Sequence, residues 1–318
     1  GAARRAYRSG ERAVFRLAEE RGAKMNSHEN IERGRGRVVR VASGVLLALL
    51  GFVVCFPLAL LVVGSFAEPA ALAESLGGVV SGEEYARLDT ALLSPSLQSY
   101  VATLFDSPAF HVLMTNSAFY AVAVLTGQVL VGAPAAWALA RFRFRGRNAL
   151  FFLYVLLMML PFQAVMLPNY LVLRELGVDN TVFAIVLPGI FSAFPVFVMR
   201  QFFAAIPDNI IESARLDGAG EWRIFLRIGV PLGAPGVFAA LMLGFFEYWG
   251  LVEQPIAFLR DQALWPISLF APTLTLENAG TVFAAAVVAA VPSVLLFLLG
   301  GDYLAQGIAA TTRGDDGK

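Results

Sequence analysis

Long uncharged, apolar runs divide the chain and predict membrane-spanning helices. Five of them reach the roughly 18 residues that a spanning helix needs: residues 41–67, 112–140, 149–173, 181–199 and 278–301. A further run, 232–246, reaches this length only if it continues past Glu247 to about Val252. The pattern predicts an all-α integral membrane protein with six transmembrane helices, and six helices place both termini on one side of the membrane.

The composition agrees with this class and excludes several catalytic ones. Hydrophobic residues make up 58% of the 318, charged residues only 15%, and mean hydropathy is +0.67, values beyond what a soluble core requires. The single cysteine, Cys55, cannot form a disulfide or a thiolate metal site within this chain. No Gly-x-x-x-x-Gly-Lys-Ser/Thr phosphate loop is present. We expect a non-catalytic chain without a cofactor or metal of its own, and no nucleic-acid partner.

Basic residues predict the orientation of the spans. If the N-terminus is cytoplasmic, 21 of the 24 Lys and Arg residues lie inside: eleven before the first span, four in 141–147, four in 200–227 and two at the tail. Only Arg87, Arg174 and Arg260 lie outside. This asymmetry satisfies the positive-inside rule, to which acidic residues contribute little. We therefore expect both termini, and the loop 207–231, to face the cytoplasm.

The loop 207–231 is charged and amphipathic, and its first part predicts a short helix. Pro207 suits the first turn, Asp208 places negative charge at the positive end of the helix dipole, and Gly218 suits the helix end. An incomplete apolar stripe follows the helix: Ile211, Ala214 and Leu216.

The second part of the loop predicts another short helix, 221–230, which ends at Pro231. Glu212 and Arg215 in the first helix lie close enough in sequence to pair. Two short charged helices joined at a glycine make a compact docking element. The alternative is a solvated loop that contacts no partner.

These residues resemble the EAA coupling loop of permease subunits in type I ABC importers. That loop has Glu-Ala-Ala, then Gly, then an Ile-x-x-Pro element; the matching residues here are Glu212-Ser213-Ala214, Gly218, Ile228 and Pro231, with Ser213 in place of Ala. Further residues resemble the carbohydrate-importing branch of this family: Asp217-Gly218-Ala219, Trp222, Ile224, Phe225, Leu97, Tyr100 and Asn116-Ser117. The resemblance extends over roughly residues 41–310.

The resemblance implies a type I permease fold in the cytoplasmic membrane of a prokaryote, importing a sugar or oligosaccharide by alternating access. It implies four kinds of partner besides the lipid bilayer: a second similar permease, two ATPase subunits that bind ATP and Mg, and an extracytoplasmic solute-binding protein. In the coupling loop it implies a charge contact to the ATPase by Glu212 and a turn at Gly218. We expect Ala214 and Leu216 to form its packed face.

Near the outer end of the fifth span, Glu247, Tyr248 and Trp249 are candidates for contact with a sugar. Carboxylates accept hydrogen bonds from hydroxyl groups, and aromatic rings stack on sugar faces. The alternative is an interfacial aromatic belt beside an acid that reaches toward water. Prolines recur within the spans: Pro161, Pro168, Pro188, Pro195, Pro235 and Pro292. They are expected around a translocation path, but they also occur in spans that move nothing.

Outside the permease domain (41–303) we expect a basic cytoplasmic arm at 1–40 and a cytoplasmic tail at 304–318. The arm lacks the apolar core of a secretion signal, and initiation at Met25 should leave transport intact. In the outer segment 68–110, we expect residues 75–84 to be a loop and residues 95–105 to lie along the membrane. This segment either touches the solute-binding protein or only connects spans.

Two other classes remain open. A membrane enzyme or scaffold would leave the resemblance of the coupling loop as a coincidence. A secondary transporter would couple uptake to an ion gradient without an ATPase partner. It usually requires an internal repeat and buried acids or histidines, and the sequence offers no clear repeat and few such groups.

Overall fold

The computed structural model describes residues 43–81, 94–270 and 278–312, with side chains absent from this description at 78–81 and 302–312. The expected basic arm (1–40) and the last residues of the tail (313–318) lie outside the described residues. The chain divides into two compact units, 1–61 and 62–318. The first unit contributes most of the helix Ser43–Ser65, the first span.

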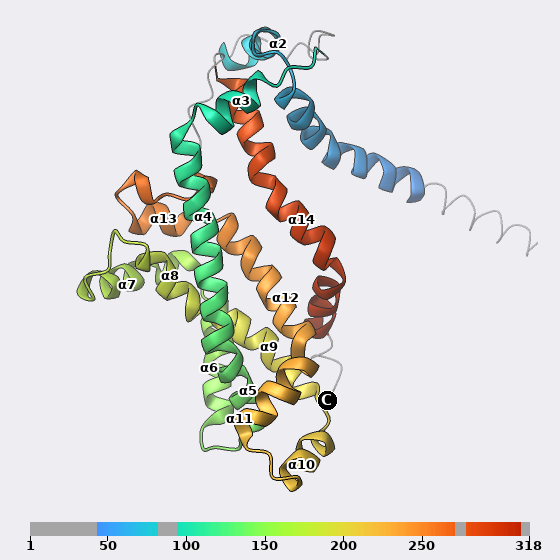
Figure 1. Cartoon of the computed structure of the whole chain (residues 1–318), viewed down its shortest axis with the longest axis vertical. Coiled ribbons are helices and arrows are strands. Elements are labelled where there is room, and N and C mark those ends of the chain that lie inside the picture. The colour runs from blue at the N-terminus through green and yellow to red at the C-terminus, as the bar shows by residue number, and fades with distance from the viewer. Residues whose placement is uncertain (1–42, 82–93, 271–277, 313–318) are drawn as a thin grey trace, which may run out of the picture. The chain divides into compact units, whose positions relative to one another are not determined.

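Helices make up almost all regular structure in the described part of the second unit, apart from one isolated bridge between Ala67 and Pro95 (Figure 1). Their bounds are α2 Pro69–Ser81, α3 Gln98–Phe105, α4 Pro108–Gly127, η2 Gln128–Gly132, α5 Ala133–Arg141, α6 Arg147–Met159, α7 Phe162–Glu175, α8 Phe183–Ile190, α9 Ala193–Ala205, α10 Asp208–Leu216, α11 Glu221–Ile224, η3 Phe225–Gly229, α12 Val230–Trp249, α13 Glu253–Phe258, η4 Gln262–Leu264, η5 Ile267–Leu269 and α14 Ala279–Thr312.

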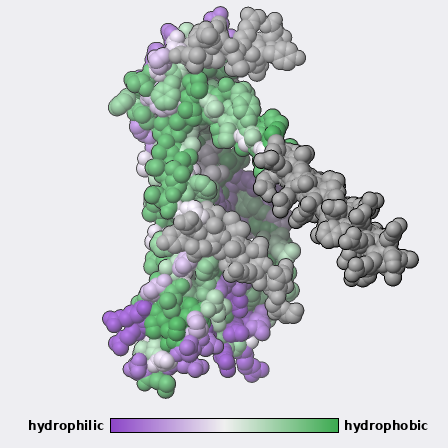
Figure 2. Space-filling view, turned by 90° about the vertical axis from the view of Figure 1, so that its right-hand side faces the viewer, coloured by the Kyte–Doolittle hydropathy of each residue, from purple (hydrophilic) through white to green (hydrophobic). Residues whose placement is uncertain are grey.

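The described residues confirm the predicted all-α membrane class. Five helices are long and apolar enough to cross a bilayer: Ser43–Ser65, Pro108–Arg141, Phe183–Ala205, Glu221–Trp249 and Ala279–Gly301. A sixth span results if the bent pair α6 and α7 crosses as one unit. Figure 2 shows hydrophobic residues over the spans and hydrophilic residues gathered at the end of the second unit where α10 lies.

The third predicted span, 149–173, is broken. Helix α6 ends at Met159, α7 begins at Phe162, and the two axes differ by 107°. Leu160 and Pro161 are both extended, because the proline ring disfavours helical geometry at the residue before it. Pro161 therefore breaks the span, whereas Pro168 is accommodated inside α7.

The fifth span is extended at the opposite end from the one we predicted. It ends at Trp249 instead of continuing to Val252, and it gains length by beginning at Glu221. The prediction that a separate helix ends at Pro231 is therefore wrong. Proline cannot donate to the preceding turn, and the π-helical turn η3 lies directly before α12, so the helix passes through Pro231 without a break.

The same solution occurs in the second span. The π turn η2 precedes Pro134, as η3 precedes Pro231, and the sequences are Gly132-Ala-Pro134 and Gly229-Val-Pro231. Widened turns of this kind let a helix accept a proline and stay continuous. Both spans therefore stay unbroken through their prolines.

The outer segment is more ordered than the sequence predicts. Residues 75–81 belong to α2 and are helical, which corrects the expected loop for that part, and residues 82–84 lie outside the described residues. Residues 98–105 form the helix α3, whose Tyr100 hydroxyl hydrogen-bonds Ser65 at 2.8 Å. Thr103 donates to the carbonyl of Thr281 at 3.2 Å, so α3 is fixed to the start of α14.

Polar side chains of α4 hold the irregular segment between α13 and α14. The Asn116 amide donates to the carbonyls of Ala263 and Trp265 at 2.8 and 2.9 Å. Tyr120 donates to the Leu264 carbonyl at 2.7 Å, and the Ser117 hydroxyl accepts from the Ile267 amide at 2.7 Å. These contacts satisfy backbone groups that no regular helix satisfies.

Glycines allow α12 to approach α9 closely. A methyl group added at Gly236 would lie 2.4 Å from the Phe202 ring, and one at Gly233 would lie 2.4 Å from the Phe203 ring. Such small residues let helix backbones pack closely within membranes, where apolar burial alone drives little association. The contact of α9 with α12 therefore depends on these two positions.

Gly236→Ala should destabilise the fold because the new methyl overlaps Phe202 close to its own backbone attachment. We expect a loss of about 1–3 kcal/mol, typical of overpacking, measured as a lower midpoint of heat-induced loss of the folded fraction in detergent. Gly301→Ala is the matched control, since nothing lies within 4 Å of its added methyl. Equal midpoints for the two variants would contradict this packing account.

Candidate functional site

The predicted coupling segment begins with the short helix α10, and its end has the geometry that we expected of Gly218. Gly218 has a φ of +79°, a conformation that side chains with a Cβ rarely adopt. Its amide donates to the carbonyl of Arg215, and the Ala219 amide donates to the carbonyl of Ala214, both at 3.0 Å. These two bonds form a Schellman motif, with Asp217 at the C-cap position.

The faces of α10 differ in part from the predicted stripe. Ile211 is 2% exposed, and Ala214 packs against the same core cluster. Leu216 is 89% exposed, so the expected packed face of Ala214 with Leu216 does not form within this chain. At about 100° per residue, Leu216 lies about 140° around the helix from Ile211. It shares a face with Glu212, four residues earlier, and both Glu212 and Ser213 are exposed.

The predicted Glu212–Arg215 pair is replaced by a pair between the two parts of the segment. Arg215 donates through Nε to Glu221 at 2.7 Å, with both side chains 43% exposed. The hydrogen bond to Glu221 raises the pKa of Arg215 above its ordinary value. A turn that ends in a left-handed glycine brings Glu221 closer to Arg215 than sequence distance suggests. The pair ties α10 to α11.

The second part of the segment is anchored in the core. Phe225 lies beside Phe203 and Trp137, with ring centroids 6.2 and 5.7 Å apart. Gly229 leaves room for Trp137, because an added methyl would lie 2.7 Å from its ring. The two remaining motif residues have structural positions here: Ile228 packs against this cluster, and Pro231 lies in the first turn of α12.

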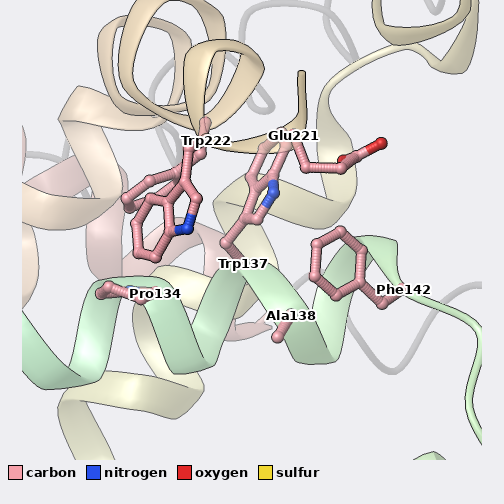
Figure 3. Close-up of a pocket in the computed structure, with 7 residues that line it drawn as sticks. Pro134, Trp137, Ala138, Phe142, Glu221 and Trp222 are labelled. Carbon is pink, nitrogen blue, oxygen red and sulfur yellow. The ribbon is translucent and has the colours of Figure 1, made fainter. Parts of the chain in front are cut away.

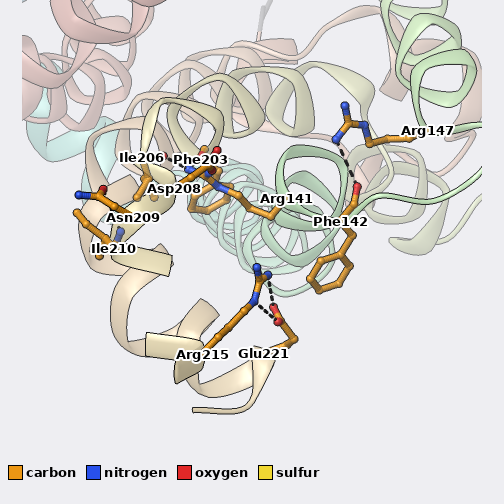
Figure 4. Close-up of polar contacts among 10 residues, drawn as sticks. All are labelled: Arg141, Phe142, Arg147, Phe203, Ile206, Asp208, Asn209, Ile210, Arg215 and Glu221. Carbon is orange, nitrogen blue, oxygen red and sulfur yellow. Dashed lines mark hydrogen bonds and ion pairs between the residues drawn. The ribbon is translucent and has the colours of Figure 1, made fainter. Parts of the chain in front are cut away.

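Arg141, at the end of α5, binds the first part of the segment (Figure 4). Its guanidinium donates to the Phe203 carbonyl at 2.5 Å, to the Ile206 carbonyl, and to Asp208 Oδ1 at 2.6 Å. The two carbonyls belong to the end of α9, where the last carbonyls lack helical partners. Arg141 therefore caps α9 and contacts the first residue of α10 at once.

Two grooves flank this arrangement. A polar groove of about 420 Å³ lies between the end of α5 and α10, and is lined by Arg141, Phe142, Arg143, Asp208, Ile211, Glu212 and Arg215. An apolar groove of about 390 Å³ lies between α5 and α11 (Figure 3), and is lined by Pro134, Trp137, Ala138, Phe142, Glu221, Trp222 and Phe225. Charged and apolar surfaces thus lie side by side at this end of the second unit.

The three candidate sugar-contact residues do not share one surface. Tyr248 is 2% exposed within a core cluster, and Trp249 is 9% exposed and donates to the Ala289 carbonyl at 2.9 Å. Glu247 alone is exposed. Three consecutive helical residues point in different directions, so this structure leaves only the carboxylate accessible for a ligand.

Comparison with known proteins identifies the family. A model described as "Binding-protein-dependent transport system inner membrane component" matches residues 128–309, more than half of the chain. The chain belongs to this family. It is a non-catalytic, multi-pass permease component of an ABC importer in the inner membrane, and the match favours this class over a secondary transporter.

Relatives across bacteria are similar to this permease. It is 27% identical over 267 residues to an arabinooligosaccharide transport system permease protein, AraQ, of Halalkalibacterium halodurans, covering 82% of this chain and 91% of that protein. It is 30% identical over 213 residues to an sn-glycerol-3-phosphate transport system permease protein, UgpE, of Yersinia pestis, covering 65% of this chain and 76% of that protein. It is 31% identical over 189 residues to a diacetylchitobiose uptake system permease protein, NgcG, of Streptomyces coelicolor, covering 57% and 63%.

A solved structure supports the fold. A chain of a bacterial ABC transporter involved in the import of the acidic polysaccharide alginate matches with a TM-score of 0.71 at 22% identity, covering 84% of this permease and 96% of that chain. At this identity the match indicates the fold alone. It confirms the expected permease architecture.

Sequence reasoning missed Trp137 and Arg141. Both lie at the end of an apolar run, where an interfacial tryptophan and an inside arginine are ordinary. Their spacing of four residues, which places both on one helix face, was the available signal. What it could not reveal is the partner segment, about 60 to 90 residues later in the chain, which these side chains contact.

Gly218→Val should fray the last turn of α10, because a β-branched residue in the left-handed conformation costs about 1–2 kcal/mol. We expect faster trypsin cleavage after Arg215 in the detergent-solubilised permease. Gly218→Asn should be cleaved nearly as slowly as native protein, since Asn tolerates this conformation.

Gly220→Val is the matched control for this experiment. Gly220 has a φ of −70° and nothing within 4 Å of an added methyl. Cleavage that rises equally in Gly218→Val and Gly220→Val would contradict the role of the left-handed turn.

Proposed function

We propose that this permease carries a sugar or oligosaccharide by alternating access and is driven by a partner ATPase that binds at residues 207–231. The observation that carries the proposal is α10, a helix fixed on one face in the core with an exposed acid and an exposed leucine on the other. The glycine turn, the Arg215–Glu221 pair and Arg141 fix its position.

The exposed face of α10 suits a protein partner. Leu216 is a large apolar side chain with 89% exposure beside the acid Glu212, and protein interfaces combine a buried apolar core with a polar rim. The polar groove lined by Arg141, Arg143 and Arg215 lies next to this face. An ATPase surface that offers an apolar pocket and complementary charge fits both features.

Movement of α10 would reach the spans through its two ends. Helix α9 precedes it across Ile206 and Pro207, and the continuous helix Glu221–Trp249 follows it after the turn at residues 217–220. A rigid displacement of α10 by the ATPase therefore tilts both spans. In this proposal Glu212 and Leu216 contact the ATPase, while Ser213, Ala214, Asp217, Gly218, Ile228 and Pro231 maintain the shape of the segment.

The substrate class rests on the relatives. Two of them are named for the transport of arabinooligosaccharides and diacetylchitobiose, and a third for sn-glycerol-3-phosphate. A sugar or oligosaccharide is the class that we infer for this chain. Glu247, exposed near the end of α12, is the candidate to accept hydrogen bonds from its hydroxyl groups.

The assembly that we infer contains a second similar permease, two ATPase subunits that supply the ATP and Mg sites, and an extracytoplasmic solute-binding protein. Residues 41–303 form the permease domain, between a cytoplasmic arm at 1–40 and a cytoplasmic tail at 304–318. The distribution of Lys and Arg supports this orientation. Helices α2 and α3 are then outside the cell membrane, where they are available to the binding protein.

A tagged chain purified in mild detergent from cells expressing the whole transporter should bring down an ATPase subunit. Glu212→Ala and Leu216→Ser should each lower its recovery, and Gly218→Trp should abolish it by deforming the turn. Each loss of about 1.4 kcal/mol in the free energy of binding the ATPase corresponds to a tenfold weaker association. Mass spectrometry of the recovered proteins measures the effect.

Leu176→Ser is the matched control, because Leu176 is 63% exposed and lies outside the coupling segment. It should leave ATPase recovery unchanged. If native chain brings down no ATPase under conditions that preserve the complex, or if Leu176→Ser lowers recovery as much as Leu216→Ser, the proposed coupling site is wrong.

A further inference from the structure

Two side chains on one face of α5 hold the two ends of the coupling segment. Trp137 and Arg141 are four residues apart, so they lie one above the other on the helix, with the Arg141 guanidinium 5.8 Å from the centre of the Trp137 ring. Arg141 contacts the start of the segment, at Ile206 and Asp208. Trp137 contacts its end, at Phe225 and Gly229.

The contacts of Arg141 need the shape of its guanidinium. The side chain is 7% exposed, and its two terminal nitrogens reach two backbone carbonyls and one carboxylate. A lysine ammonium is a point charge without this planar fork. Asp208 is 81% exposed, and exposed ion pairs contribute little. The hydrogen bonds to the carbonyls of Phe203 and Ile206, rather than the ion pair with Asp208, therefore stabilise the position of Arg141 most.

The Trp137 ring, which also lines the apolar groove, makes close contacts with Phe203 and Gly229. The ring packs edge-on against Phe203, with centroids 5.5 Å apart, and against the backbone of Gly229. Trp137 is 3% exposed and Phe203 is fully buried. Close-packed interiors transmit displacement because their side chains have no space into which to relax.

We propose that Arg141 is a positioning residue of the transport cycle which, with Trp137, makes α5 and the coupling segment move as one body. The second span is then driven directly by α10, although it is not adjacent to α10 in sequence. This inference rests on the proposed function. Covalent continuity moves α9 and α12, and the Trp137–Arg141 contacts add the span Pro108–Arg141 to the moving part.

A purely stabilising role for Arg141 makes a different prediction. If the guanidinium only caps α9, its loss lowers the amount of folded protein, while the assembled transporter that is recovered moves as native protein does. A positioning role changes the movement in the assembled transporter itself. The distance between α10 and the second span, measured in two states of the cycle, separates the two roles.

The test uses spin labels at Leu130 and Ser213, with Cys55→Ser removing the native cysteine. Leu130 is 69% exposed in η2, within the span that ends at Arg141, and Ser213 is exposed on α10. The tagged chain is purified with its partner subunits in lipid nanodiscs. Pulsed electron paramagnetic resonance then gives the distance between labels without nucleotide and after trapping with ATP and vanadate.

We expect one narrow distance that is the same in both states for the native chain and for Asp208→Asn, which keeps both carbonyl contacts. In Arg141→Met the distance should differ between the two states, and in Arg141→Lys its distribution should broaden. The inference is wrong if the native distance changes on trapping, or if the distance in Arg141→Met stays the same in both states. In either case, recovery of the ATPase with the native chain still supports the proposed function. Absence of ATPase from the native complex would overturn both.

Discussion

A backbone carbonyl freed inside a membrane protein must find a donor within the protein, because lipid offers none. Side chains meet that constraint at two helix ends in the described part of this permease. Arg141 donates to the carbonyls at the end of α9, and the buried Gln128 amide donates to the Gly189 carbonyl at 3.0 Å, near the break between α8 and α9. The Phe203 and Gly189 carbonyls also accept from the backbone amides of Ile206 and Ser192 at 3.4 and 3.3 Å, so each side chain adds a second donor.

The same constraint explains where the chain is able to change direction. The π turns η2 and η3 let the second and fifth spans pass Pro134 and Pro231 without a break. At Pro161 no such turn is present, and the third span bends by 107°. The end of α5, the end of α9 and the start of α12 all lie beside the coupling segment.

The length of the uncharged apolar runs predicted the class and most of the spans, because lipid imposes length and apolarity on every span. The prediction of the coupling segment came from its resemblance to a known motif. The turn at Gly218 was also predictable, since glycine has a distinct conformational preference there. Contacts across the chain were not predictable. Arg215 pairs with Glu221 instead of Glu212, Tyr248 and Trp249 face the interior, and Leu216 faces outward. Each of these depends on where another helix lies.

A photo-crosslinking amino acid at position 216 tests the central claim most directly. It replaces the exposed Leu216 of α10 in the otherwise native chain, and irradiation of membranes from cells expressing the whole transporter captures what lies against it. The account predicts crosslinks to an ATPase subunit, identified by mass spectrometry, and none to that subunit from position 176. Crosslinks at 216 to lipid or solute-binding protein alone would contradict it.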